Sequence, residues 1–297
     1  MLLLAVCPAA GCQARPQETV KVFCWSLTPQ AKAVISGLER GLGRSLPVVE
    51  AGGDYDRGEL LVRELAHEKL QLLVVLGTQA LMLTAPRIKK TPVVFALVAD
   101  PYHTGAAYNK AHPEDHQANI TGVASPPPLE EALRQGGKLF PAKRRWGLLY
   151  NPGEGSSLEL QQHMAALAQQ SGLELTARPA ATESEAMAQL TALPSQGVEV
   201  IFIPPDYFSQ DYASSLLQLG KERRLVVING NPRIDGKGAV LTVTLDYDAV
   251  GEEAARLAQR LLAGEKPAKI PIVTASPAQV QVDEALLSQW AGYPPGR

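Results

Sequence analysis

The sequence predicts an α/β protein with parallel sheets, arranged as two lobes. Apolar runs of strand length recur along the chain, as at residues 72–76 and 93–98 and, interrupted only by Glu199, at residues 198–203. Such runs are typical of strands that are buried on both faces. Segments with helical spacing of apolar residues separate them, which is the alternation of a parallel α/β protein. Ser-Pro-Pro-Pro at residues 125–128 interrupts the alternation, and we interpret it as the first crossover between two lobes.

The first block begins the alternation with four strands and three helices. The turn at Gly77-Thr78 is expected to place Thr78 at the N-cap of the third helix. A short extended segment, residues 119–123, closes the block. The expected strands are residues 20–24, 46–49, 72–76 and 93–98, and the expected helices are residues 29–42, 56–69 and 79–85.

The second block repeats the pattern. Ser156 or Ser157 is expected to cap its second helix. The expected strands are residues 146–150, 173–177, 198–203, 225–229 and 239–243, and the expected helices are residues 129–140, 156–170, 183–193 and 209–221. A helix at 249–263, an extended segment at 270–273 and a terminal helix at 283–290 complete the chain.

Length and charge limit the possible functions. A chain of 297 residues is long enough for about two domains. The net charge of −2 gives no reason to expect nucleic acid as a partner. Beyond the first residues, no apolar run is long enough to span a bilayer.

The N-terminus, MLLLAVCPAAGC, is similar to the end of a bacterial lipoprotein signal peptide. Small residues precede Cys12, and a polar segment follows it, so residues 1–18 are expected to be a leader and tether with Cys12 as the lipidated residue. The alternative is a ragged cytoplasmic N-terminus. Cys24 lies in an apolar strand and is expected to be a small core residue, so no disulfide framework is predicted.

Polar residues follow the predicted strands. Ligands of parallel α/β sheets bind beyond the carboxyl ends of the strands, often at a helix N-terminus. Polar groups at the strand ends of both blocks therefore suggest one ligand held between two sheets. The simpler alternatives are that Thr78 only caps its helix and that Asp100 only forms a turn before Pro101. The candidate ligand-binding residues are Ser26, Thr78, Gln79, Asp100, Asn151, Ser156, Ser157, Asp206, Tyr207, Asn229, Asn231 and Asp246.

The sequence shows no standard catalytic or metal-binding motif. His112 and His116 match no standard metal spacing, and Pro113 prevents them from sharing a regular helical face, so a solvated loop at residues 102–118 is expected and no metal. No nucleophile elbow, P-loop or glycine-rich dinucleotide motif follows a strand. No cofactor is expected, and an α/β enzyme is the weakest of the alternatives.

Several segments together carry a family resemblance. They are VVLGTQA at 74–80, PVVFALVADP at 92–101, NITGV at 119–123, LLYNPGEGSS at 148–157, IFIPPD at 201–206 and LDYDAVG at 245–251. In this order and spacing, they are similar to the substrate-binding proteins of ABC transporters with the type I periplasmic-binding architecture. The resemblance is greatest to the branch whose members bind amino acids, some of them aromatic.

This resemblance implies two Rossmann-like lobes joined by three crossovers. Residues 19–122 plus 242–270 would form the first lobe, and residues 123–241 plus 271–293 the second. A small molecule would bind between the lobes, which would close around it. The expected partners are this ligand, an ABC permease and, through the lipid anchor only, the membrane; the expected state is a monomer outside the cytoplasm.

The resemblance also implies roles for single residues. Thr78 and its helix N-terminus, helped by Ser156 or Ser157, would bind the carboxylate of an amino acid, and Asp206 would bind its ammonium group. The alternative for Asp206 is a cap for the helix that starts near Ser209. Two departures from the family are Pro205, where a threonine is usual, and the longer loop at 102–118. A ligand sensor of the same fold without a transporter is an alternative function.

Overall fold

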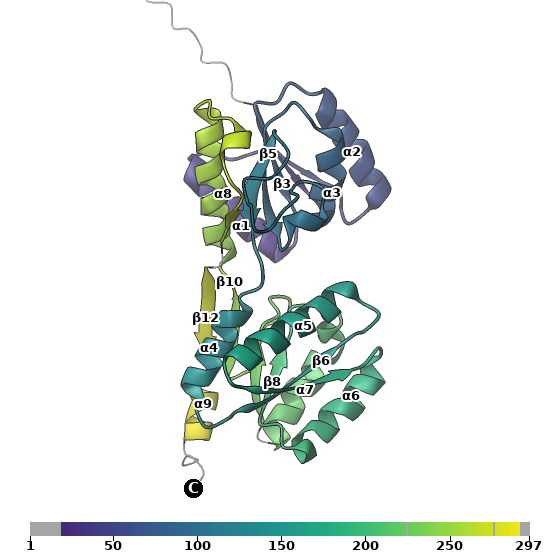
Figure 1. Cartoon of the computed structure of the whole chain (residues 1–297), viewed down its shortest axis with the longest axis vertical. Helices are drawn as coiled ribbons and strands as arrows, with labels where there is room; N and C mark the ends of the chain where they lie inside the picture. Colours follow the sequence, from purple (N-terminus) through teal and green to yellow (C-terminus); the bar gives the residue numbers. More distant parts are fainter. Residues whose placement is uncertain (1–18, 224, 276, 292–297) are drawn as a thin grey trace, which may run out of the picture.

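The computed structural model describes residues 19–223, 225–275 and 277–291. This part of the chain forms two α/β lobes, each built on a six-stranded sheet (Figure 1). The strand order is β11-β5-β4-β3-β1-β2 in the first sheet and β12-β10-β9-β8-β6-β7 in the second. All described strand pairs are parallel except β10 with β12. The predicted parallel α/β class is therefore confirmed.

The first sheet is covered on both faces by helices. Helices α1 (Pro29–Leu42) and α8 (Tyr247–Leu262) pack on one face. Helices α2 (Tyr55–His67) and α3 (Thr78–Arg87) pack on the other. Its strands are β1 (Val20–Cys24), β2 (Val48–Glu50), β3 (Leu72–Leu76), β4 (Val93–Val98), β5 (Ile120–Ala124) and β11 (Val273–Thr274). All five residues of β3 are buried, as expected for a strand with helices on both sides.

The second sheet is covered in the same way. Helices α4 (Leu129–Leu139), α5 (Gly155–Gln170) and α9 (Glu284–Ala291) lie on one face, and α6 (Glu183–Ala192) and α7 (Ser209–Arg223) lie on the other. Its strands are β6 (Arg145–Tyr150), β7 (Glu174–Pro179), β8 (Val200–Ile203), β9 (Val226–Asn229), β10 (Leu241–Leu245) and β12 (Ala278–Val282). Short 3-10 turns are η1 (Pro101–His103), η2 (Leu193–Gln196) and η3 (Pro267–Lys269).

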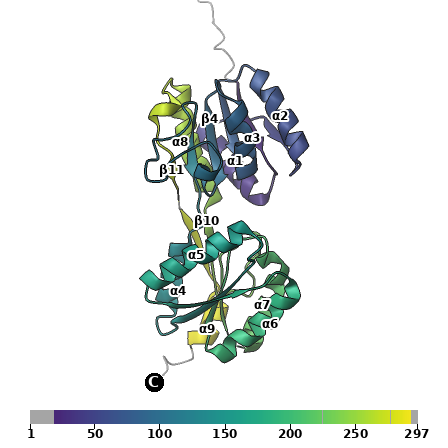
Figure 2. The same ribbon diagram turned by 45° about the vertical axis from the view of Figure 1, so that its right-hand side comes forward.

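The described chain passes between the lobes three times, after β5, after β10 and after β11 (Figure 2). The predicted boundaries are displaced by a few residues from these passages. The boundary after residue 122 falls inside β5, and the boundary after residue 241 falls inside β10. Segment β11, predicted to belong to the second lobe, pairs with β5 in the first sheet. Sequence periodicity does not reveal where a strand leaves one sheet, because its apolar pattern continues into the crossing.

Three local predictions are corrected by the structure. The N-cap of α3 is Gly77, with φ of +102°, and Thr78 is the first helical residue. Helix α5 begins at Gly155 with Glu154 at its N-cap, so neither Ser156 nor Ser157 caps it. Strand β12, with the sequence AQVQV, was not expected; it pairs antiparallel with β10 at the sheet edge.

The loop at residues 102–118 is less solvated than predicted. The ring of His116 is buried, and its Nε2 lies 3.0 Å from the carbonyl oxygen of Ile270. The backbone N–H of Ile272 donates to the carbonyl of Pro113 at 2.9 Å. The loop therefore packs against the segment that leads to β11. Among the described residues, no group of three His, Cys, Asp or Glu side chains is arranged to hold a metal ion.

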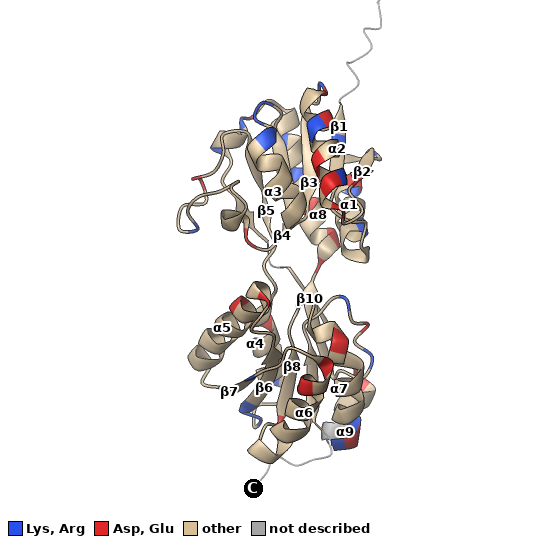
Figure 3. Ribbon diagram, turned by 90° about the vertical axis from the view of Figure 1, so that its right-hand side faces the viewer, with Lys and Arg blue, Asp and Glu red and all other residues tan. Residues whose placement is uncertain are grey.

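Charged residues of both signs lie on the helices and loops around the two sheets (Figure 3). No described helix combines the length and apolarity needed to cross a membrane. As predicted, Cys24 lies in the core. Its burial raises the pKa of the thiol to about 11, so the thiol is protonated at neutral pH.

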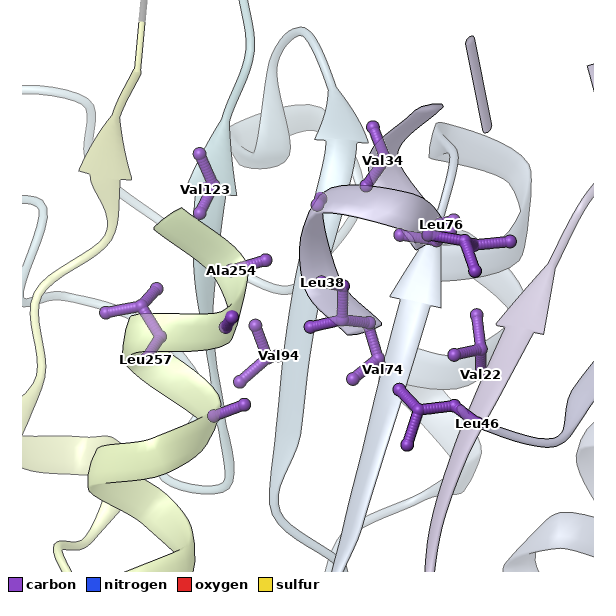
Figure 4. Packing of buried hydrophobic residues seen from close by; sticks show 14 of the residues in the cluster. Val22, Val34, Leu38, Leu46, Val74, Leu76, Val94, Val123, Ala254 and Leu257 are labelled. Carbon is purple, nitrogen blue, oxygen red and sulfur yellow. The ribbon is translucent and has the colours of Figure 1, made fainter. Parts of the chain in front are cut away.

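Helices α1 and α8 approach each other closely above the first sheet (Figure 4). Glycines make this approach possible, because a Cβ atom at Gly251 would overlap the backbone carbonyl of Val34. A Cβ atom at Gly37 would likewise overlap the carbonyl of Asp248. Arg40 of α1 also forms ion pairs with Asp248 and Glu252 of α8. Helix α8, which follows the second passage between lobes, is thus fixed to the first lobe.

Candidate functional site

A cavity of about 520 Å³ lies between the lobes. Its walls are formed by the segments that follow the carboxyl ends of β1, β3, β4, β8 and β9 and by two of the crossing segments. The parallel strands bring these segments to the facing edges of the two sheets. The lining residues are Trp25, Ser26, Thr28, Gln30, Gly53, Leu76, Gly77, Thr78, Gln79, Leu97, Ala99, Ser125, Pro127, Pro128, Pro205, Tyr207, Gly230, Pro232, Arg233, Leu245 and Tyr247.

The N-terminus of α3 borders this cavity. Gly77 adopts φ of +102°, a conformation that glycine tolerates and other residues rarely adopt. It has no side chain to accept the first N–H groups of the helix, and α3 has no side-chain cap. The first N–H groups of a helix have no intrahelical partner and carry partial positive charge. Thr78 and Gln79, which begin the helix, line the cavity, so this end is suited to an anionic or polar group.

Aromatic side chains contribute to three parts of the wall: Trp25 after β1, Tyr207 after β8 and Tyr247 after β10. Burial raises the pKa of Tyr247 to about 12, so its phenol stays protonated at neutral pH. The guanidinium carbon of Arg233 lies 4.3 Å from the centroid of the Tyr207 ring, which is a cation–π contact. The wall thus combines flat apolar surfaces with a few polar groups, as small-molecule sites usually do.

Leu97 gives the wall an unusual backbone. Its φ is +58°, and no other non-glycine residue in the described part of the chain has a positive φ. The register between β4 and β5 shifts between Phe95 and Val98, so Leu97 lies at a bulge. Bulges often occur next to binding sites, where they redirect a side chain. A left-handed conformation at leucine is strained, and such strain persists only where the surrounding structure fixes it.

A buried polar network lies behind the second-lobe wall. Asp206 is 3% exposed; its Oδ2 accepts a hydrogen bond from Ser157 Oγ at 2.6 Å, and its Oδ1 accepts the N–H of Ser209 at 2.8 Å. Asn231 Nδ2 donates to the Asp206 carbonyl at 2.8 Å and to Ser209 Oγ at 2.7 Å. Burial raises the pKa of Asp206 despite these hydrogen bonds.

This network fixes two loops of the wall. Pro205 and Tyr207, which flank Asp206, line the cavity. Pro232, which follows Asn231, also lines it. In both loops, the polar residue points into the lobe and its neighbours border the cavity. The contact with Ser209, the first residue of α7, is the helix-capping alternative foreseen for Asp206.

The structure divides the predicted site residues into two groups. Ser26, Thr78, Gln79 and Tyr207 line the cavity. The others do not border it; they are Asp100, Asn151, Ser156, Ser157, Asp206, Asn229, Asn231 and Asp246. Most of this second group bind the backbone locally.

Asp100 accepts the N–H of Tyr102 at 2.8 Å, and Asp246 accepts that of Ala249 at 3.0 Å at the start of α8. Asn151 Oδ1 accepts the N–H of Gly153 at 2.9 Å, and Asn229 Oδ1 accepts that of Asn231 at 2.9 Å. Ser156 is exposed on the first turn of α5.

Several lining residues were missed from the sequence. Trp25, Arg233 and Tyr247 closely follow the carboxyl ends of β1, β9 and β10. Their position after a strand is therefore a sequence signal, once aromatic and basic residues are counted as possible ligand contacts beside the small polar ones. Gln30 lies in the first turn of α1 and offered the same signal. Leu97 gave none, because a leucine at the end of an apolar run is indistinguishable from a core residue.

Known proteins resemble this chain over most of its length. The family model described as ABC transporter substrate binding protein matches residues 43–290. A curated protein from Clostridioides difficile, named tyrosine-binding protein, is 20% identical over 251 residues, which are 84% of this chain and 72% of that protein.

Two solved structures share the fold. The ligand-free, open structure of a substrate-binding protein with adhesive properties from Clostridium difficile has a TM-score of 0.84 and 18% identity, covering 92% of this chain and 95% of the other. The structure of an ABC domain in complex with L-Trp from Streptococcus pneumoniae has a TM-score of 0.70 and 19% identity, covering 92% and 94%.

These similarities confirm the type I periplasmic-binding fold, with two α/β lobes joined by three crossovers. The family is one of substrate-binding proteins rather than of enzymes. The matched residues, 43–290, include the second lobe, most of the first lobe and 17 of the 21 residues that line the cavity. The chain therefore belongs to the ABC transporter substrate-binding protein family.

Proposed function

We propose that this protein binds an aromatic amino acid outside the cytoplasm and delivers it to the permease of an ABC importer. The main support is the cavity between the lobes, which aromatic side chains line together with an uncapped helix N-terminus. Aromatic rings contact flat apolar ligands well, and helix N-termini bind carboxylates. The names of the relatives agree with this class, because one is called tyrosine-binding and one contains L-Trp.

Within this proposal, the residues of the wall have distinct tasks. The N–H groups and side chains of Thr78 and Gln79 bind the ligand's carboxylate. Trp25 and Tyr207, from opposite lobes, contact the aromatic ring. Tyr247 keeps its hydroxyl proton and donates a hydrogen bond. Because the two rings come from different lobes, a bound ligand stabilises an arrangement in which the lobes are closer together.

The crossing segments are the expected hinges of this closure. Two of them contribute directly to the cavity wall, through Ser125, Pro127 and Pro128 in one and Leu245 and Tyr247 in the other. Movement of the lobes therefore changes the shape of the cavity. The overall backbone is more similar to the ligand-free, open relative, with a TM-score of 0.84, than to the tryptophan complex, with a TM-score of 0.70.

Lipidation at Cys12 is part of the proposal, although Cys12 lies outside the described residues. A lipid anchor would keep the protein at the membrane beside its permease. Metabolic labelling with a palmitate analogue tests this step. We expect label in the wild type and none in Cys12→Ala; equal labelling of both would remove the anchor from the proposal.

Calorimetric titration of the purified protein with each of the twenty amino acids tests the binding function. We expect tyrosine or tryptophan to bind with a Kd in the micromolar range or below, and small-angle scattering to show a smaller radius of gyration at saturation. No binding by any amino acid at millimolar concentration would overturn the proposal.

A further inference from the structure

The cavity wall carries one kind of charge. Of the described residues that line the cavity, only Arg233 has a side chain that is charged at neutral pH, and no carboxylate lines the wall. Nearby acids are already engaged with backbone N–H groups: Glu50 with Leu27 at 2.7 Å, Asp100 with Tyr102, and Asp246 with Ala249. Asp206 is held inside the second lobe by Ser157 and Ser209. The cavity therefore presents positive charge from both lobes, from Arg233 and from the α3 N-terminus.

The side chain of Arg233 is exposed to solvent at this wall, and contacts of its loop hold it in position. Asn231 Oδ1 accepts the backbone N–H of Arg233 at 2.9 Å, and Asn231 itself belongs to the buried network. Gln30 of the first lobe donates to the carbonyl of Pro232, the preceding residue, at 2.9 Å. The guanidinium lies over the Tyr207 ring. These contacts restrain the backbone of the loop and keep the guanidinium at the Tyr207 ring.

The guanidinium keeps its hydrogen-bonding edge for another group. No carboxylate in the described part of the chain lies within ion-pair distance of Arg233. Apart from the cation–π contact with Tyr207, no side-chain N–H group of Arg233 donates a hydrogen bond within the described part of the chain. A planar fork of donors matches the two oxygens of a carboxylate.

We propose that Arg233, in cation–π contact with Tyr207, binds an anionic group of the ligand, so that the cleft selects organic anions with a flat apolar body. This inference rests on the proposed function, because it assumes a ligand between the lobes. It specifies the charge of that ligand: the carboxylate is essential, and the ammonium group of an amino acid is dispensable. If Asp206 were the counter-charge of the ammonium, as the sequence suggested, the ammonium would be essential instead.

Analogues that lack one charged group separate these alternatives. The probes are tyrosine, its deaminated analogue 3-(4-hydroxyphenyl)propionate and its decarboxylated analogue tyramine, with tryptophan, indole-3-propionate and tryptamine as a second set. We expect each propionate to bind within about tenfold of its amino acid. Each amine should bind at least about 30-fold more weakly, because the proposed closure of the lobes would desolvate the charge pair, and loss of one partner of such a pair has an effect of at least this size.

Substitutions in the same loop identify the residue responsible. Arg233→Gln should weaken binding of the amino acid and the propionate by at least about 30-fold, and Arg233→Lys by less. Lys237→Gln is the matched control: it removes the same charge four residues further on, from a side chain that does not line the cavity. We expect this control to stay within about threefold of the wild type, because Lys237 lies outside the cavity and its charge, paired with Asp235, stays in solvent when a ligand binds.

The outcomes also separate this inference from the proposed function. The role of Arg233 would be overturned if the amine bound as tightly as its amino acid, or if Arg233→Gln bound tyrosine or tryptophan with unchanged affinity. The proposed function would stand in either case. A propionate that fails to bind would favour an essential ammonium and overturn the inference. If none of the six compounds binds the wild type, both the inference and the assignment to aromatic amino acids fall.

Discussion

The side-chain amide of Gln30, in α1 of the first lobe, donates a hydrogen bond of 2.9 Å to the carbonyl of Pro232 in the second lobe. Both residues line the cavity, so this bond links the lobes at the site itself. Pro232 also precedes Arg233, and the bond therefore restrains the loop that carries the cationic side chain. A single neutral hydrogen bond stabilises by about 0.5–1.5 kcal/mol, which is enough to restrain a loop without locking the lobes.

Replacing Gln30 with alanine should loosen this loop. We expect faster amide hydrogen exchange at residues 230–238 in Gln30→Ala, measured by mass spectrometry on the ligand-free protein. Gln259→Ala is the matched control, because Gln259 donates a similar bond of 2.8 Å to Gly41 within the first lobe. Exchange at residues 230–238 should be unchanged in this control. Equal exchange in wild type and Gln30→Ala would show that the bond does not restrain the loop.

The strained backbone at Leu97 gives a second prediction. In Leu97→Gly, relief of the left-handed strain, worth about 1–2 kcal/mol, should nearly offset the loss of a partly buried side chain. We expect a free energy of unfolding within about 1 kcal/mol of the wild type. Leu76→Gly, at the buried end of β3, should lose roughly 3–5 kcal/mol, because it removes core packing without relieving strain. Urea unfolding measures both; similar losses would mean that Leu97 stores no strain.

The sheets were largely predictable because their strands are apolar on both faces. Runs such as Leu72–Leu76 and Val93–Val98 were found with their observed bounds. Strand β12 was not found, because its alternating AQVQV sequence is that of an edge strand and its pairing with β10 depends on the return of the chain from the first lobe. Pairing across such a separation leaves no local signal.

The site was predictable by segment but not by side chain. The segments after β8 and β9 were correctly expected near the cleft, yet Asp206 and Asn231 point into the lobe while Tyr207 and Arg233 line the cavity. Adjacent residues in an extended loop face opposite directions. A prediction that is wrong by one residue therefore names a side chain of the buried network instead of one that lines the cavity. Polar residues were favoured as ligand contacts, whereas here their main partners are buried backbone groups and hydroxyls.

The close contact between α1 and α8 gives a third prediction. Gly251→Ala should lower the free energy of unfolding by about 1–3 kcal/mol, because the new methyl group overlaps the backbone of Val34 and the helices must separate. Gly137→Ala in α4 is the control, since no atom lies within 4 Å of the added methyl group. This change should stabilise by up to about 1 kcal/mol through helix propensity. Thermal unfolding compares the two; a neutral Gly251→Ala would mean that the helices have room to adjust.

The buried carboxyl of Asp206 makes stability depend on pH. Burial raises the pKa of Asp206 in the folded protein above its ordinary value of 3.8. Below pH 3.8, the carboxyl is protonated in both the folded and the unfolded chain. As the pH rises above this value, the unfolded chain loses its proton first, so the folded state binds more protons and the free energy of unfolding falls until the raised pKa is passed. Each unit of difference between the two pKa values corresponds to about 1.4 kcal/mol.

Asp206→Asn removes this titration while it preserves the size of the side chain. The loss or gain of hydrogen bonds to Ser157 and Ser209 shifts stability by an amount that does not depend on pH in this range. We therefore expect the stability of the wild type relative to Asp206→Asn to fall as the pH rises from 3.5 to 6.5, measured by urea unfolding at intervals of one pH unit.

Glu131→Gln provides the opposite control for this measurement. A hydrogen bond from Arg134 lowers the pKa of Glu131, so the wild type should gain stability relative to Glu131→Gln as the pH rises. The effect should be small, because this ion pair lies at the surface. If the difference between wild type and Asp206→Asn stays constant across the same range, burial does not destabilise the charged form of the Asp206 carboxyl.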